Sequence, residues 1–257
     1  MVGGRDWQAE YERTYAGPPS AVQERVWRQI FGDDYPEGVD PFSCISRTEL
    51  ERVAAEVRIG TADTLADLGC GRGGPGLWVT MATGARLIGI DIAENALTAA
   101  RERATSLGLA DRASFRQASF ESTGLLAESV DAVISIDALL FAADKAAAVA
   151  EVRRVLRDGG RFVLTSWDYH DQPVGRPPQV SDHRPLLMSE GFDVVAYEET
   201  SEWRRRTIDT TVALLENVEE LAAESLEDVD EVRARLEEMY ASTAAMSRRI
   251  LAVAEAV

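Results

Sequence analysis

Short apolar runs alternate with segments whose apolar residues recur at helical spacing over the middle of the chain. The short runs predict strands, and the segments between them predict helices. Regular alternation of this kind predicts parallel strand–helix–strand units with right-handed crossovers, and therefore an α/β fold. The expected strands lie at residues 65–68, 86–91, 113–117, within 129–137, and at 161–166 and 192–197.

Helical patterns flank this region on both sides. Near the start, Trp7, Tyr11 and Tyr15 recur at helical spacing, and a second helix follows from about residue 21. Late in the chain, a glutamate-rich stretch carries leucines at helical spacing. The expected division is a helical cap at residues 1–50, an α/β core at 51–205, an inserted helical cap at 206–247, and a last segment at 248–257 that fits either a helix end or a strand.

A glycine-rich turn follows the first expected strand, with glycines at positions 69, 71, 73, 74 and 76. Glycine permits positive φ and lets a ligand touch the backbone, and the amides that begin the next helix face that ligand. The second expected strand ends at Asp91, about 20 residues past the turn, where a carboxylate can accept hydrogen bonds from two ribose hydroxyls. The sequence therefore predicts an adenosine-type ligand, the alternative being a turn that only connects a strand to a helix.

Two ligand classes share this geometry, because Gly69-x-Gly71-x-x-Gly74 also satisfies the dinucleotide fingerprint. Asp67 separates them: a pyrophosphate would meet its carboxylate as a like charge, whereas a cationic or zwitterionic ligand would not. The pattern Asp-x-Gly-x-Gly-x-Gly, with an acid after the second strand, resembles the class I S-adenosylmethionine-dependent methyltransferases. One alternative is an NAD(P)-dependent reductase, but the sole lysine, Lys145, has no tyrosine one helical turn away. The other is a non-catalytic S-adenosylmethionine-binding protein.

The resemblance covers about residues 50–197 and implies a Rossmann-like fold. Its mostly parallel sheet would have seven strands with helices on both faces, the last strand being antiparallel and lying in residues 248–257. The implied cofactor is S-adenosyl-L-methionine. Carried over by position, Gly69 and Gly71 contact its methionine part through their backbones, with Cys70 between them as a small residue. Asp67 approaches its ammonium group, and Asp91 holds its ribose hydroxyls.

For the adenine ring, the resemblance implies packing against Ile92. It also implies a cofactor contact from Ile136, in the stretch at the end of the fourth strand that borders both cofactor and acceptor. The family commonly has an acidic residue after the third strand, and this chain departs from that pattern. Ser119 and Phe120 stand there instead. We therefore expect the Ser119 hydroxyl and the Phe120 backbone to contact the ring edge.

The acceptor is expected beyond the fourth and fifth strands. Some relatives place a histidine base after the fourth strand, but this chain has Leu140 and Phe141 there, so that base is absent. Asp137 either orients an acceptor hydroxyl or amine, or caps the next helix. His170, after the fifth strand, is either a general base or substrate contact or an exposed loop residue. The residues expected to line the acceptor site are Tyr11, Tyr15, Phe141 and Trp167.

The implied reaction is methyl transfer to an oxygen, nitrogen or carbon nucleophile of a small molecule, by in-line displacement that depends mainly on positioning. The resemblance points to the branch that modifies natural products in bacterial secondary metabolism. High arginine content with a single lysine fits a GC-rich bacterial genome.

Composition limits the classes of binding partner that we expect for this chain. The formal net charge of −17 argues against binding to nucleic acid or an anionic membrane. Two cysteines, Cys44 and Cys70, provide neither a disulfide framework nor a metal cluster. The chain starts without an apolar targeting segment and carries no run of membrane-spanning length, so we expect a soluble, cytoplasmic protein. We expect a monomer or homodimer.

Overall fold

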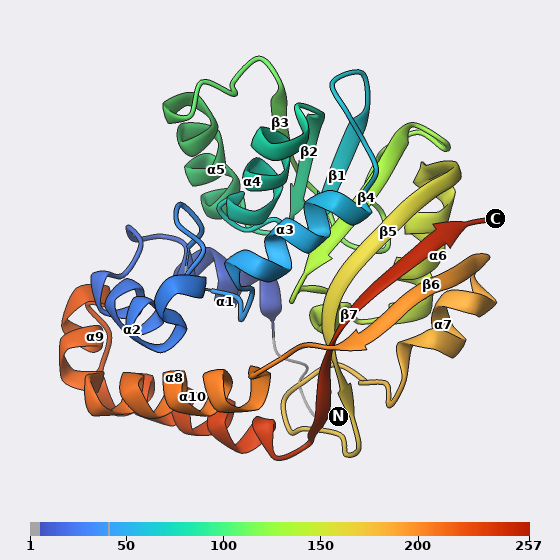
Figure 1. Ribbon diagram of the computed structural model, residues 1–257. Helices are drawn as coiled ribbons and strands as arrows, with labels where there is room; N and C mark the ends of the chain where they lie inside the picture. Colours follow the sequence, from blue (N-terminus) through green and yellow to red (C-terminus); the bar gives the residue numbers. More distant parts are fainter. Residues whose placement is uncertain (1–5, 41) are drawn as a thin grey trace.

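The computed structural model describes residues 6–40 and 42–257. Within them, strands form one seven-stranded sheet in the order β3-β2-β1-β4-β5-β7-β6 (Figure 1). Neighbours among the first five are parallel, and β7 is antiparallel to both β5 and β6. The strands are β1 (Thr64–Leu68), β2 (Arg86–Asp91), β3 (Ala113–Gln117), β4 (Val130–Ile136), β5 (Leu156–Tyr169), β6 (Phe192–Glu199) and β7 (Met246–Ala256). The predicted mostly parallel sheet with an antiparallel last strand is confirmed.

Helices cover both faces of the sheet because successive strand side chains point to opposite sides. On one face, Ala66 and Val133 belong to an apolar cluster with α6 and α7. On the other, Leu65 and Ile134 belong to a cluster with α3, α4 and α5. These helices are α3 (Arg47–Glu56), α4 (Gly74–Thr83), α5 (Glu94–Ser106), α6 (Lys145–Val155) and α7 (His183–Ser189).

The segments expected as two caps pack together as one body. We call α2 (Ala21–Phe31), α8 (Trp203–Glu216), α9 (Val218–Ser225) and α10 (Val229–Thr243) the helical lobe. Its core joins Val26 and Phe31 of α2 to Leu214, Val218 and Leu236 of the later helices. Figure 1 shows α2 beside α8 and α9, with the lobe below the sheet. The start and the end of the chain therefore build one wall together.

Helix α1 (Trp7–Thr14) contains no fully buried residue and lies between the lobe and the core (Figure 1). Glu12 connects it to the core, because its carboxylate accepts from the backbone amides of Glu94 and Asn95 at 2.8 and 3.0 Å. These amides begin α5, so the carboxylate also lies where a helix favours negative charge.

Two boundaries differ from the sequence expectation. Helix α6 ends at Val155, and β5 begins at Leu156, which pairs with Val130 before a shift in register. Strand β5 also continues to Tyr169 because residues 161–169 pair with β7. The segment expected as a loop after residue 166 is therefore strand, and this changes where its side chains point.

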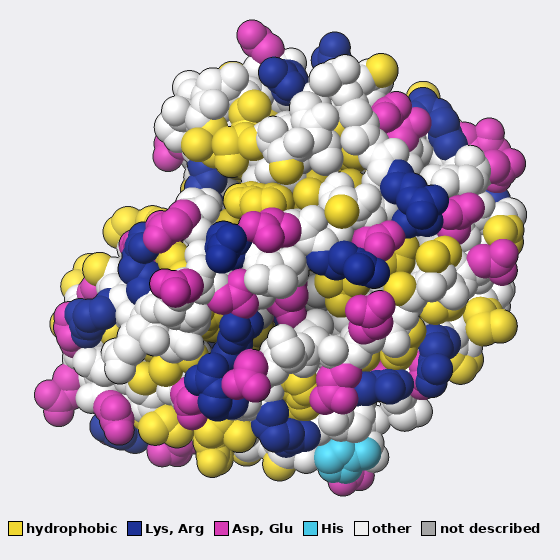
Figure 2. All heavy atoms as spheres, in the orientation of Figure 1, with side chains coloured by type: hydrophobic (Ala, Val, Ile, Leu, Met, Phe, Trp, Pro, Cys, Tyr) yellow, Lys and Arg dark blue, Asp and Glu magenta, His cyan; other side chains and the backbone are white. Residues whose placement is uncertain are grey.

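The surface carries both signs of charge. Figure 2 shows acidic and basic side chains interspersed over the visible face rather than gathered in a basic patch. Among the described residues, no helix combines the length and the apolar character needed to cross a membrane.

Candidate active site

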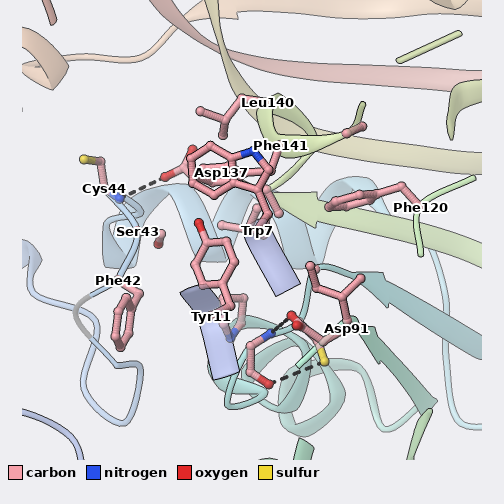
Figure 3. Close-up of a pocket in the computed structure, with 18 of the residues that line it drawn as sticks. Trp7, Tyr11, Phe42, Ser43, Cys44, Asp91, Phe120, Asp137, Leu140 and Phe141 are labelled. Carbon is pink, nitrogen blue, oxygen red and sulfur yellow. Dashed lines mark hydrogen bonds between the residues drawn. The ribbon is translucent and has the colours of Figure 1, made fainter. Parts of the chain in front are cut away.

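A cavity of about 410 Å³ lies where the carboxyl ends of β1, β2 and β4 face α1 and the helical lobe. This is the edge of an open parallel sheet at which ligands bind. The cavity wall includes every residue expected to contact cofactor or acceptor except His170. Figure 3 shows Tyr11, Asp91, Phe120 and Asp137 converging on it from different elements.

The backbone of the glycine turn forms part of the cavity wall. Gly69, Gly71 and Gly73 have φ values of +74°, +50° and +76°. A Cβ on Gly69 would collide with the Ala138 side chain, and one on Gly71 would lie 2.8 Å from the Tyr15 hydroxyl. The turn therefore needs glycine both for its dihedral angles and for the close approach of its neighbours.

Asp67 carries the main electrostatic feature of the site. Its side chain is buried, and its Oδ2 has no hydrogen-bond partner. Burial, with repulsion from Asp91, raises the pKa of Asp67 to about 7, against the effect of the Gly76 amide. A buried carboxyl group with one unpartnered oxygen is stabilised by a cation and destabilised by an anion. The Asp67 carboxyl group thus favours a ligand with an ammonium group and disfavours a pyrophosphate.

Asp91 ties the second strand to the turn. Its Oδ2 accepts from the Gly71 amide at 2.8 Å, and its Oδ1 accepts from the Ala93 amide at 3.0 Å. Burial raises the pKa of Asp91, while these amides favour the ionised form. Each carboxylate oxygen has further lone pairs, so the group can still accept from ligand hydroxyls.

The other residues expected to contact the cofactor also lie at the cavity. Ile92, Ser119, Phe120 and Ile136 all line it. Phe120 lies against the turn, since a Cβ on Gly69 would be 3.1 Å from its ring. Apolar side chains that could pack on a ring therefore line the same cavity as Asp91.

Aromatic rings from α1 close the opposite side. The rings of Trp7 and Tyr11 are stacked with centroids 6.1 Å apart, and those of Tyr11 and Tyr15 are 5.9 Å apart. Phe141, in the short helix η2 (Leu139–Phe141), meets Trp7 and Tyr11 edge-on at 5.0 and 5.3 Å. These rings form an aromatic part of the cavity wall.

Asp137 lines the cavity, but its carboxylate is fully engaged. Its Oδ1 accepts from Thr165 Oγ1 at 2.7 Å and its Oδ2 from the Cys44 amide at 2.9 Å (Figure 3). Arg249 donates to both oxygens. Neither of the two roles expected from the sequence fits this arrangement, because no lone pair is left for an acceptor and the carboxylate caps no helix.

Of the two roles expected for His170, the structure fits the exposed loop residue and not the general base or substrate contact. His170 is exposed, lies outside the cavity wall, and follows β5 at a point where its amide donates to the Ala245 carbonyl. The strand continues past residue 166, so it carries Trp167 to the cavity and His170 beyond it. The other histidine, His183, is buried and bonds Asp168 at 2.8 Å, away from the cavity.

Several wall residues were not expected from the sequence. Arg72, inside the turn, donates to the Gly17 carbonyl at 2.6 Å and lies over the rings of Tyr15 and Phe42. Arg176 lies over the rings of Trp7 and Phe141 from the loop after β5. Residues of α8 and α10 also line the cavity: Thr207, Thr210, Thr211, Met239, Ser242 and Thr243. Of these residues, only the three threonines form a pattern that the sequence shows, because they recur at helical spacing.

Part of this chain is similar to known methyltransferases. A family model described as a methyltransferase domain matches residues 66–164. Methyltransferase GfsG of Streptomyces halstedii is 31% identical over 129 residues, which cover 50% of this chain and 46% of that protein. The match thus spans less than half the length of this curated relative.

Solved structures share the fold along nearly the whole chain. The [4+2]-cyclase SpnF has a TM-score of 0.72 at 18% identity, covering 93% of this chain and 98% of that one. Geranyl diphosphate C-methyltransferase from Streptomyces coelicolor A3(2), crystallised with S-adenosyl-L-homocysteine, has a TM-score of 0.69 at 17% identity, covering 100% of both chains. At these identities the likeness shows the fold alone. The family match covers residues 66–164, so this part of the α/β core, which holds the glycine turn and Asp91, is similar to a methyltransferase domain.

Proposed function

We propose that this chain binds S-adenosylmethionine at the glycine turn and transfers its methyl group to a small molecule in the rest of the cavity. The observation that carries the proposal is the buried Asp67 carboxyl group, which has an unpartnered oxygen beside bare turn backbone. This group suits the ammonium of a cationic nucleoside. The cofactor supplies an electrophilic methyl group.

The residues of the chain bind and orient the reactants. The turn at Gly69 and Gly71 offers backbone to the methionine part, Asp91 accepts from the ribose hydroxyls, and Ile92 and Phe120 pack on the adenine. The α1 rings exclude water. Holding two reactants in line supplies on the order of 7 to 11 kcal/mol of a displacement barrier, so positioning accounts for most of the catalysis.

Composition and relatives bear on the class of acceptor and on the biological context of the enzyme. A net charge of −17 supports a small-molecule acceptor over a nucleic acid. Arginine-rich composition and a Streptomyces relative support a bacterial enzyme of secondary metabolism. We further propose that it is cytoplasmic and acts as a monomer or homodimer. The nucleophile is an oxygen, nitrogen or carbon atom of the acceptor.

Calorimetry with S-adenosylmethionine, S-adenosylhomocysteine and NAD tests the proposal. We expect the first two to bind at micromolar affinity or better and NAD not to bind. Asp91→Ala should weaken binding at least tenfold, about 1.4 kcal/mol. Asp193→Ala, an exposed carboxylate on β6, is the control and should bind as the parent does. Tight NAD binding, or unchanged affinity in Asp91→Ala, would overturn the assignment.

Turnover separates an enzyme from a binding protein. If the cofactor binds and no acceptor from a broad panel of alcohols, phenols, amines and carbon nucleophiles such as alkenes and enols is methylated, the chain is a binding protein. It would then bind S-adenosylmethionine at this site and catalyse no methyl transfer.

A further inference from the structure

Arg176 places a positive charge on the cavity wall, at the end beyond the cofactor residues. It lies in the loop after β5, and its guanidinium carbon is 5.3 Å from the Trp7 ring centroid and 4.9 Å from that of Phe141. A ring packs on the face of a planar guanidinium, so contacts of this kind leave the N–H groups at its edge available. Within the described part of the chain, these N–H groups form no hydrogen bond or ion pair.

The loop that carries Arg176 is fastened to the core on the side of residues 178 and 179. Lys145 Nζ donates to the Pro178 carbonyl at 2.6 Å, and Gln179 Nε2 donates to the Leu140 carbonyl at 2.9 Å. These bonds hold the loop against the cavity before any ligand binds. A binding group that is already in place loses less conformational entropy when a ligand arrives.

The carboxylates of the cavity wall do not neutralise Arg176. Asp137 is paired with Arg249 instead. Asp40 forms its ion pair with Arg103. The other three lie within, or directly follow, the segments expected to hold the cofactor: Asp67, Asp91 and Glu121. The Arg176 guanidinium is therefore available as a counter-ion for a ligand.

A second donor at this end also lacks an acceptor. Trp167, near the end of β5, is a buried residue of the cavity wall, and its Nε1 has no hydrogen-bond partner. Phe141, which contacts Arg176, packs against the apolar cluster that contains Trp167. A buried N–H without an acceptor is costly, so a ligand oxygen beside the indole would stabilise it. The hydroxyls of Ser43 and Thr210, also on the wall, donate to no described group.

We infer that the acceptor is a largely apolar molecule with an anionic oxygen group, a carboxylate or a phosphate, which binds the Arg176 guanidinium and the Trp167 N–H. The guanidinium fork matches the geometry of both groups. The aromatic and aliphatic side chains around it suit an apolar skeleton. Arg176 is then a specificity-determining residue that orients the acceptor. The inference rests on the proposed function, because it concerns the second substrate of that reaction.

Four naphthalene derivatives test the inference without a known acceptor. They are 2-naphthoate, 2-naphthyl phosphate, methyl 2-naphthoate and 2-naphthylmethylammonium. Their dissociation constants are measured on the protein saturated with S-adenosylhomocysteine. We expect at least one of the two anions to bind about tenfold or more tighter than the ester and the ammonium, as charge-assisted hydrogen bonds allow. The tighter anion identifies carboxylate or phosphate as the group that is recognised.

Two arginines that lie over aromatic rings provide the first variant and its control. Arg176→Gln removes the charge from the wall, so the tighter anion should lose most of its advantage over the ester. Arg184 lies 4.9 Å from the Tyr197 ring centroid, outside the cavity wall. Arg184→Gln makes the same change in net charge and should leave the preference unchanged.

The indole donor has a control on its own strand. Trp167→Phe removes the N–H and should weaken binding of the tighter anion about threefold or more. Tyr169 of β5 also has a buried hydroxyl without a partner, but it lies outside the cavity wall. Tyr169→Phe should bind the anion as the parent does. Equal anion affinities in these two variants would overturn the contact with Trp167.

Other outcomes overturn the inference as a whole. Equal affinity of the ester and both anions would show that charge does not select the acceptor, and tightest binding of the ammonium would show that the wall binds a cation. A preference for the anion that survives in Arg176→Gln, or binding by none of the probes, would contradict the inference as well. Titration of S-adenosylhomocysteine with each variant shows separately whether the variant is folded and whether the proposed cofactor site is correct.

Discussion

Arg249 of β7 donates to both carboxylate oxygens of Asp137, with Nε–Oδ1 and Nη2–Oδ2 distances of 3.0 Å each, and both side chains are buried. Arg249 Nη1 also reaches Glu49 at 2.8 Å. The pair connects the end of β4, the last strand and α3. It also explains how Asp137 keeps a left-handed φ of +53°, a costly conformation that surrounding contacts must stabilise.

Breaking this pair should cost stability rather than chemistry. Arg249→Met leaves the Asp137 carboxylate buried without its counter-ion and should lower the free energy of unfolding by about 3–5 kcal/mol in urea titrations. Asp137→Asn combined with Arg249→Met removes both charges and should be less destabilised than Arg249→Met alone. A loss below about 1 kcal/mol for Arg249→Met would contradict the structural role.

Asp67 should make cofactor affinity depend on pH. Because its pKa is raised to about 7, much of the group is protonated at about pH 6, and a bound ammonium favours the ionised form. Binding of S-adenosylhomocysteine at this pH should therefore release protons, measured as a heat that varies with buffer ionisation enthalpy. Affinity should rise between about pH 5.5 and pH 7.

The control for this measurement is Asp67→Asn, which should release no proton. The same group affects stability with the opposite sign. The native carboxyl group binds its proton more tightly than the unfolded chain does, so its contribution to stability falls as pH rises from about 4 to about 7. Proton release unchanged in Asp67→Asn would assign the effect to another group.

Lys145 gives a second pH signature. Its Nζ donates to the carbonyls of Leu140, Ala142 and Pro178 at 3.2, 3.3 and 2.6 Å, and burial lowers its pKa to about 8. Between about pH 8 and pH 10.5 the unfolded chain holds this proton more strongly, so stability from this group rises with pH.

Lys145→Met should remove that part of the slope, seen as the difference between variant and parent in urea titrations at several pH values. Identical slopes in both proteins would show that the Lys145 ammonium is better solvated than its contacts imply.

The two histidines should behave in opposite ways. His170→Ala removes an exposed side chain outside the cavity and should leave both stability and cofactor affinity within error of the parent. His183→Ala removes a buried partner of Asp168 and should lower the free energy of unfolding by about 1–3 kcal/mol while cofactor affinity is retained. Loss of methyl transfer in His170→Ala would restore it as a catalytic candidate.

The α/β core and its cofactor end were determined by the sequence itself. Strand and helix periodicity are local, and glycines at fixed spacing with an acid on either side specify a turn whose backbone geometry depends on its own residues. For this reason Asp67, Gly69, Gly71 and Asp91 reach the cavity at the places expected from the chain alone.

Only the tertiary structure decided the acceptor end. The helical lobe that supplies much of its wall joins segments about 200 residues apart, as in the bond from Ser20 Oγ to Glu224, and no local pattern records such a contact. Whether Asp137 is free or neutralised depends on Arg249 on a distant strand, and the position of His170 depends on how far β5 pairs with β7. Side-chain roles set by long-range pairing follow from the packed fold, because the same residue is exposed or buried according to its partners.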